Sequence, residues 1–354
     1  MARDHGFHEI RIIRVIQETP DTRTYVLDAP FRYRAGQFVT FRVGGTQRSY
    51  SMSSSPDADA ELMTTVKRVP GGLVSNWMHD NLTAGAVVQV TAPAGVFCLR
   101  ETAAPLVAFA GGSGITPIIS LAKSALATTE RRVRILTANR DAESVIFRTA
   151  LDDLARRYQG RLEVRHHLDV ASGLVGKAEV LDFAGPDPGA DFYLCGPAPF
   201  MDLIERVLLA RGADAGQIFS ERFAVETPPA GPADGPELAA GRGGSGTAGL
   251  GSPGPVGTGA ADAGGTITIV LGGRRTPVAR TAGLTLLQSA RRAGLTPPFS
   301  CEAGNCATCI GRVTEGEVTM RANNALDDDE IADGWTLTCQ SEPVTPDVTV
   351  VYED

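Results

Sequence analysis

Several features are absent from this sequence of 354 residues, and each absence excludes a class of protein. No apolar run approaches the roughly 18–20 residues that a membrane helix needs, so we expect no membrane partner. Residues 1–8 contain neither an apolar stretch nor a small-residue cleavage site, which argues against a secretory signal. We therefore expect a cytoplasmic protein, in which cysteine thiols stay reduced.

Lysine is absent from the C-terminal quarter, and basic residues are in deficit there. Residues 265–354 contain 7 Arg but 12 Asp and Glu, and the whole chain carries a formal net charge of -8. An acidic segment of this kind argues against a nucleic-acid partner. It indicates either an ordinary solvated surface or a patch that docks on a basic protein.

One segment lacks aromatic residues altogether. Residues 226–264 contain 12 Gly and 6 Pro but only three aliphatic side chains larger than alanine. Such a composition cannot bury enough apolar surface to offset the entropy of ordering. We predict a flexible linker here, with an end-to-end distance of about 35 Å as a random coil.

The length of the chain predicts two or three domains. The segments before and after the linker differ in their pattern of expected strands and helices. Residues 1–102 read as short strands broken by glycine and proline turns, with one helix over 74–82, which predicts an antiparallel β-barrel. In residues 103–225, strands at 106–110, 133–138, 162–166 and 192–195 alternate with helices at 116–127, 144–158 and 199–210. This pattern predicts an α/β domain with a parallel sheet and helices on both faces. Residues 265–354 read as a mainly β module with a helix near 284–293, an α+β domain.

Four of the six cysteines lie in the last segment with a particular spacing. Cys301, Cys306 and Cys309 come from one short loop, and Cys339 follows 29 residues later. The spacing C-x4-C-x2-C with one distant cysteine is the plant-type [2Fe–2S] pattern. Four thiolates also bind zinc, but zinc sites usually pair two short knuckles, and here Cys339 stands alone. The surrounding residues resemble the ferredoxin domain at the C-terminal end of oxygenase reductases, which gives a β-grasp-like expectation for this domain.

The segment Arg48-Ser49-Tyr50-Ser51 resembles the flavin motif of the ferredoxin–NADP reductase superfamily. An arginine can pair with a pyrophosphate, and a tyrosine can pack against the isoalloxazine ring. The resemblance implies that Ser51 reaches flavin N5, where the hydride arrives. A second flavin element of the superfamily is matched in position and order, and it adds the candidate FAD contacts Val66, Lys67, Gly71, Gly72, Leu73 and Ser75. The segment 93–97 resembles FAD-binding members, so FAD is favoured over FMN.

A glycine-rich loop at 111–114 follows a buried strand and opens a helix at Thr116 and Pro117. Such a loop is a seat for a pyrophosphate. The segment Cys195-Gly196-Pro197 resembles the C-G-P motif of the same superfamily, in which the cysteine lies beside nicotinamide C4; the alternative is a buried cysteine that packs as a small hydrophobe. The candidate nicotinamide-nucleotide contacts are Gly112, Ser113, Gly114, Thr116, Arg140, Cys195, Gly196 and Pro197. The candidate catalytic residues are Ser51 and Cys195.

Two further positions leave alternatives open. Arg140 and Asp141 follow the second strand, where an acidic side chain favours the ribose of NADH and an arginine can favour the 2′-phosphate of NADPH. The wider segment resembles NADH-linked members, so NADH is preferred and NADPH stays an alternative. Glu221 ends the second domain, where related reductases place an acid or aromatic residue near the flavin, but a solvated strand end fits the sequence as well.

The order of barrel, nucleotide domain, linker and ferredoxin domain resembles the NAD(P)H-dependent reductase components of bacterial oxygenases. The resemblance implies an enzyme that moves electrons from NADH through FAD and a [2Fe–2S] cluster, one at a time, to a terminal oxygenase. We expect a monomer. The alternatives are a stand-alone diaphorase or flavin reductase, a redox-sensing [2Fe–2S] module, and a structural zinc protein.

Overall fold

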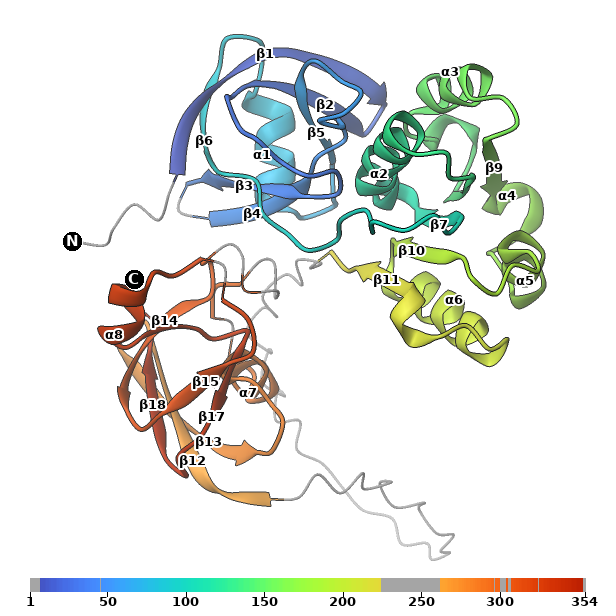
Figure 1. Ribbon diagram of the computed structural model, residues 1–354. Coiled ribbons are helices and arrows are strands. Elements are labelled where there is room, and N and C mark those ends of the chain that lie inside the picture. Colours follow the sequence, from blue (N-terminus) through green and yellow to red (C-terminus); the bar gives the residue numbers. More distant parts are fainter. Residues whose placement is uncertain are drawn as a thin grey trace, which may run out of the picture.

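The computed structural model of the chain describes residues 7–44, 46–223, 262–295, 297–299, 304, 307–323 and 325–352. Three groups of strands follow one another along the chain, each with its own helices (Figure 1). Each group has at least one hydrophobic core of its own. The predicted multidomain architecture is therefore confirmed.

The first group is an antiparallel sheet of six strands in the order β4-β3-β6-β1-β2-β5. Val39 and Phe41 point into its core, as the alternation of the sequence predicted, and helix α1 contributes Met78 to the same core. A bridge between Met52 and Thr64 links the end of β4 to β5 and closes the sheet into a barrel. The elements are β1 (Phe7–Thr19), β2 (Thr22–Asp28), β3 (Phe38–Val43), β4 (Thr46–Ser51), β5 (Leu62–Lys67), α1 (Leu73–Asn81) and β6 (Val87–Thr91).

The second group is a parallel sheet of five strands in the order β11-β10-β7-β8-β9. Strand β7 shows why helices cover both faces: Leu106 and Ala108 point into one core, while Val107 and Phe109 point into the other. The elements are β7 (Leu106–Gly111), α2 (Ile115–Thr128), β8 (Val133–Asn139), α3 (Arg148–Arg157), β9 (Leu162–Leu168), α4 (Asp169–Ser172), α5 (Lys177–Ala184), β10 (Asp191–Cys195), α6 (Ala198–Ala210) and β11 (Ile218–Glu221), with short 3-10 turns at Gly112–Gly114, Ala142–Ser144 and Ala215–Gln217.

The helix predicted over 144–158 begins later than expected. Asp141 and Ser144 form a capping box that closes the turn before it, and Phe147 then adopts a left-handed conformation with φ of 60°. A non-glycine residue in this conformation interrupts a right-handed helix, so α3 starts only at Arg148. The sequence analysis also missed α4 and α5, and it placed only the end of β11, at Glu221.

The third group is a mixed sheet of five strands in the order β13-β12-β18-β14-β16, beside a two-stranded sheet of β15 and β17. Leu286 and Ala290 of α7 pack against Ile267 and Val350, which confirms the predicted α+β class. Strand β12 starts at Asp262, inside the end of the segment predicted as a linker, and residues 226–261 lie outside the described residues. The elements are β12 (Asp262–Leu271), β13 (Arg274–Thr281), α7 (Leu286–Arg292), β14 (Ile310–Glu315), β15 (Val318–Met320), α8 (Asp328–Ala332), β16 (Trp335–Leu337), β17 (Ser341–Pro343) and β18 (Val348–Val351).

Helix α2 joins the first two groups through buried polar contacts. The Ser120 hydroxyl donates to the carbonyl of Ser54 at 2.6 Å, and the hydroxyls of Ser55 and Ser124 lie 2.7 Å apart. Lys123 also pairs with Asp59 at 2.9 Å. Because these partners come from the loop after β4, the contacts hold this loop against the middle of α2.

Candidate functional site

Strand β4 carries the predicted flavin motif. The guanidinium of Arg48 donates to the carbonyl of Gln47 at 2.7 Å, and the ring of Tyr50 lies edge-on to Phe41 with 5.8 Å between centroids. Ser51, the last residue of the strand, is buried, and its hydroxyl donates to Oε2 of Glu221 at 3.0 Å. The side chains of Arg48 and Tyr50 are thus half-buried on the barrel. The hydroxyl of Ser51 points to the second domain.

The second predicted flavin element follows β5. Gly71 has φ of +75°, and a Cβ at Gly72 would lie 2.6 Å from the Ser75 hydroxyl, so both glycines suit the turn that starts α1. Leu73 is 68% exposed at that helix start. Lys67 lies 3.5 Å from Asp21, and the Val66 side chain is in the barrel core. Of the predicted contacts, Val66 can therefore offer a ligand only its backbone.

The two predicted nicotinamide loops touch each other at the carboxyl ends of the neighbouring strands β7 and β10. A Cβ at Gly114 would lie 2.1 Å from the carbonyl oxygen of Cys195, and one at Gly196 would lie 2.9 Å from the Cα of Gly111. Both positions therefore require glycine. This edge of a parallel sheet is where nucleotides bind in α/β folds.

Thr116 lies in the first turn of α2, and the surroundings of its hydroxyl show whether this edge fits a nucleotide. The residue is 2% exposed, and its hydroxyl has no hydrogen-bond partner within the described part of the chain. A buried hydroxyl without a partner costs about 1–3 kcal/mol. A bound group that hydrogen-bonds to Thr116 would offset this cost, so the site fits a ligand at the glycine loop.

Ser51, Cys195 and Glu221 come together although they are far apart in the sequence. Strands β10 and β11 pair Cys195 directly with Glu221, and Ser51 reaches the same carboxylate from the barrel. Burial raises the pKa of Glu221 to about 8, although the hydrogen bond from Ser51 opposes the shift. Burial, with a further contribution from Glu221, also raises the pKa of the Cys195 thiol well above its usual range. Glu221 is thus half-buried and held by Ser51, unlike a solvated strand end, and the Cys195 thiol is neutral at pH 7.

Arg140 and Asp141 lie at the carboxyl end of β8. Arg140 pairs with Asp141 at 2.9 Å, and its side chain is 74% exposed. The Asp141 carboxylate also accepts from the amide of Ser144 at 2.9 Å, and the Arg140 guanidinium lowers the pKa of Asp141. Asp141 is thus fixed by two contacts, whereas the guanidinium of Arg140 projects into solvent.

The described cysteines of the predicted cluster lie in one apolar pocket of the third domain. Cys309 and Cys339 are both buried and share a hydrophobic cluster with Leu287 and Leu326. Burial raises the pKa of Tyr352, and both thiols raise it further. Cys301 and Cys306 lie outside the described residues. Two buried thiols that converge from separate segments are half of the four-cysteine donor set that a [2Fe–2S] cluster needs.

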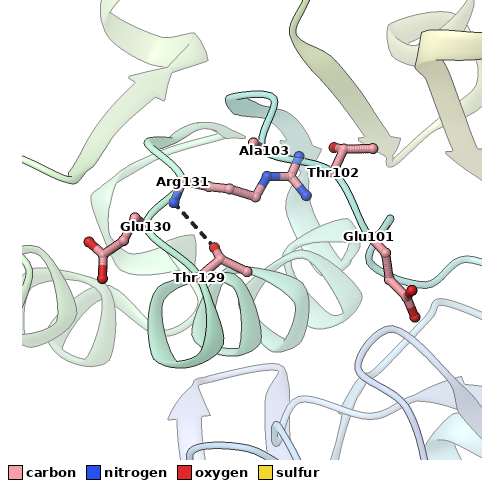
Figure 2. A pocket seen from close by; sticks show the side chains of 6 residues that line it. All are labelled: Glu101, Thr102, Ala103, Thr129, Glu130 and Arg131. Carbon is pink, nitrogen blue, oxygen red and sulfur yellow. Dashed lines mark hydrogen bonds between the residues drawn. The ribbon is translucent and has the colours of Figure 1, made fainter.

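A hollow of about 510 Å³ lies away from these residues (Figure 2). Figure 2 shows Arg131 extending from the loop before β8 toward Ala103 and Thr102. This is the amino edge of the parallel sheet, opposite the glycine loops. Arg131 forms an ion pair with the buried carboxylate of Asp191 at 2.7 Å, so the lining of the hollow is a structural junction. The lining residues are Glu101, Thr102, Ala103, Thr129, Glu130 and Arg131.

Three sequence families match the three domains in this order. The family described as "Oxidoreductase FAD-binding domain" matches residues 9–98, "Oxidoreductase NAD-binding domain" matches residues 109–206, and "2Fe-2S iron-sulfur cluster binding domain" matches residues 269–344. The chain is therefore an oxidoreductase that combines FAD-binding, NAD-binding and [2Fe–2S] domains, as the sequence analysis predicted.

Similarity to curated relatives covers nearly the whole chain. It is 36% identical to the ferredoxin reductase component of 3-ketosteroid-9-alpha-monooxygenase from Mycolicibacterium smegmatis, over 98% of this chain and 97% of the relative. It is 34% identical to a glycine betaine monooxygenase reductase subunit from Pseudomonas aeruginosa, over 98% and 96%. The chain belongs to the family of reductase components of oxygenase systems.

A solved structure shares the fold of the whole chain. The solved structure of phthalate dioxygenase reductase matches with a TM-score of 0.60 at 23% identity and covers 99% of both chains, a likeness of fold. Within the described residues, no helix is long and apolar enough to cross a membrane.

Proposed function

We propose that this protein takes electrons from NADH and delivers them, through FAD and a [2Fe–2S] cluster, to a terminal oxygenase that hydroxylates or epoxidises its substrate. The observation that carries the proposal is the hydrogen bond from Ser51 to Glu221, because it joins the flavin strand of one domain to the nicotinamide edge of the next. The relatives named above serve a ketosteroid monooxygenase and a betaine monooxygenase, and a 29% identical chain from Escherichia coli belongs to 1,2-phenylacetyl-CoA epoxidase. The two monooxygenase relatives share the reductase role, whereas the substrates of their systems differ.

In this proposal FAD is held by the barrel. Arg48 pairs with the pyrophosphate and Tyr50 packs on the ring system. The amides around Gly71 and Gly72 and the Ser75 hydroxyl approach the phosphates. When bound, FAD would supply a carrier that accepts the two electrons of a hydride together and can release them one at a time, which the one-electron cluster requires.

The second domain positions the dinucleotide. The loop Gly112-Ser113-Gly114 seats the pyrophosphate, Thr116 uses its unpartnered hydroxyl on the bound nucleotide, and Cys195 with Gly196 and Pro197 orients the nicotinamide. Ser51 supports the reacting edge of the flavin. Glu221, protonated at pH 7 because of its raised pKa, holds a proton beside Ser51 and Cys195.

We propose NADH as the preferred donor, with Asp141 as the reason. An acidic side chain at the end of the second strand accepts from a ribose 2′-hydroxyl and repels a 2′-phosphate. Asp141 is held in place by Arg140 and by the amide of Ser144, so its carboxylate is preorganised.

The four cysteines Cys301, Cys306, Cys309 and Cys339 would ligate the cluster in the acidic third domain. That domain would dock on a basic face of the oxygenase. The protein would act as a monomer in the cytoplasm, with domains at 1–102, 103–225 and 265–354. The segment 226–264 would connect the second domain to the third, and its last three residues belong to β12.

The test is rapid anaerobic mixing of the purified protein with NADH, with flavin and iron–sulfur absorbance followed separately. We expect the flavin to bleach first and the cluster second, and the reduced protein to be reoxidised by an oxidised oxygenase of the family. Bleaching of the flavin with a cluster that stays oxidised would contradict the electron route. The Cys195→Ser variant should slow the first phase about tenfold or more and leave the order of the phases unchanged.

A further inference from the structure

A hydrogen bond connects the cluster loop of the third domain with the flavin strand of the first. The hydroxyl of Thr308 donates to Oε1 of Gln47 at 3.1 Å. The two residues are 261 positions apart in the sequence, and Figure 1 shows the third domain beside strands β3 and β4.

Each partner of this hydrogen bond directly precedes a residue of a redox site. Thr308 precedes Cys309, a predicted cluster ligand, and Gln47 precedes Arg48, the first residue of the flavin motif. The backbone carbonyl of Gln47 also accepts from the Arg48 guanidinium at 2.7 Å. A short chain of covalent and hydrogen bonds therefore runs from the cluster loop to the arginine of the flavin strand.

The local backbone presents Thr308 for this contact. Ala307 adopts φ of 51°, a conformation rare for a residue with a side chain, just before Thr308. Thr308 itself is buried, and the carbonyl of Cys309 accepts from both the amide and the hydroxyl of Thr338, at 3.1 and 2.7 Å. The loop is thus fixed within its own domain, so Thr308 offers its hydroxyl to the barrel from a rigid support.

We propose that Gln47 and Thr308 form the docking contact that holds the ferredoxin domain against the flavin strand while electrons pass between them. The inference rests on the proposed function and adds the surface through which the two redox domains meet. Gln47 is a positioning residue: within the described residues its side chain hydrogen-bonds to Thr308, and it acts through this contact. A hydrogen bond between neutral side chains holds the domain only weakly, so the ferredoxin domain is free to undock and present the same loop to the oxygenase.

The direct test uses the holoprotein and the variants Gln47→Ala and Thr308→Val, mixed anaerobically with NADH. Loss of one neutral hydrogen bond shifts an equilibrium by about two- to tenfold. We expect cluster reduction to slow by about this factor, while flavin reduction keeps the wild-type rate. The double variant should be no slower than the slower single variant, because both changes remove the same contact.

Gln89→Ala is the matched control. Gln89 lies on β6 in the same cross-strand row as Gln47, since both are paired with Arg42 of β3, and it is also partly buried. We expect wild-type rates for this variant. Equal slowing in Gln89→Ala and Gln47→Ala, or wild-type cluster reduction in both docking variants, would overturn the proposal.

Amide hydrogen exchange of the oxidised holoprotein gives a second readout that needs no NADH. Gln47→Ala should speed exchange both in residues 46–51 and in residues 307–311, whereas Gln89→Ala should leave residues 307–311 unchanged. Unchanged exchange in both segments of Gln47→Ala would overturn the docking contact. A wild-type protein whose flavin is not reduced by NADH would instead overturn the proposed function, and the exchange experiment would still decide on docking.

Discussion

Glu221 is the residue whose role depends most on the fold. In the sequence it is one acid at the end of a short strand, but in the structure Ser51 donates to it across 170 positions and Cys195 pairs with it in the sheet. No local pattern contains this convergence, because it depends on how two domains pack. By contrast, the predicted cluster cysteines could be recognised from spacing alone, since a single loop supplies three of them.

The raised pKa of Glu221 predicts a pH dependence. A carboxyl whose pKa rises to about 8 on folding stabilises the fold below its ordinary pKa and loses this contribution as the pH rises through about 8. We expect the rate of flavin reduction by NADH to fall above pH 8, where the proton held beside Ser51 is lost. Glu221→Gln should remove this fall and give a flat profile. Stopped-flow measurements between pH 6 and about 9.5 test this, and a wild-type rate that does not change with pH would contradict it.

Thr116→Val should separate stability from binding. Removal of a buried hydroxyl that has no partner among the described residues should leave the free energy of unfolding unchanged or raise it by up to about 1 kcal/mol. NADH affinity should fall by about two- to tenfold, because the nucleotide loses its hydrogen bond. Thermal unfolding and equilibrium titration with NADH measure the two effects. A destabilised variant with wild-type affinity would show that the hydroxyl serves the fold instead.

At the scale of elements, periodicity explains what was predicted well. The strands of the barrel and the sheet could be located because their side chains alternate or form short apolar runs, as in β3 and β7. The start of α3 was wrong because the left-handed Phe147 follows a capped turn, and no residue type there marks that conformation. The closure of the barrel through Met52 and Thr64 depends on the pairing of distant strands, which local sequence does not specify.

The contact between the two glycine loops predicts a steric requirement at Gly114. Its φ of −61° suits any residue, so only the 2.1 Å approach of a Cβ to the Cys195 carbonyl excludes a side chain. Gly114→Ala should push the loops apart, lower the free energy of unfolding by about 1–3 kcal/mol and strongly reduce NADH oxidation.

Gly176→Ala is the control for Gly114→Ala. Gly176 has φ of −110°, and no atom of the described segments lies within 4 Å of a Cβ built there, so the substitution should be silent in both measurements. Urea unfolding and steady-state NADH oxidation with an artificial acceptor would be compared. Equal effects of the two substitutions would show that the loop contact has no special importance.

At the scale of the whole molecule, the order of the domains could be predicted from motifs, whereas their contacts could not. Two contacts join segments that only the fold brings together. One links the loop after β4 to α2, and the other is the hydrogen bond between Thr308 and Gln47. The uneven charge is a whole-chain property that was visible in the sequence, because the last 90 residues hold most of the acidic excess.

This charge predicts how transfer to the oxygenase responds to salt. Attraction between the acidic third domain and a basic partner is screened as ionic strength rises. The rate of oxygenase reduction should fall on the order of tenfold between low and high salt, while flavin reduction by NADH changes little. Stopped-flow traces over a salt series would show this. Transfer that is insensitive to salt would favour the stand-alone diaphorase.

The most direct test of the electron route is an anaerobic titration of the purified protein with NADH, monitored by its visible spectrum after its flavin, iron and sulfide have been quantified. We predict one FAD and one [2Fe–2S] cluster per chain, both bleached by about 1.5 equivalents of NADH, because the flavin holds two electrons and the cluster one. Saturation at about one equivalent, with the iron–sulfur absorbance intact, would contradict the account.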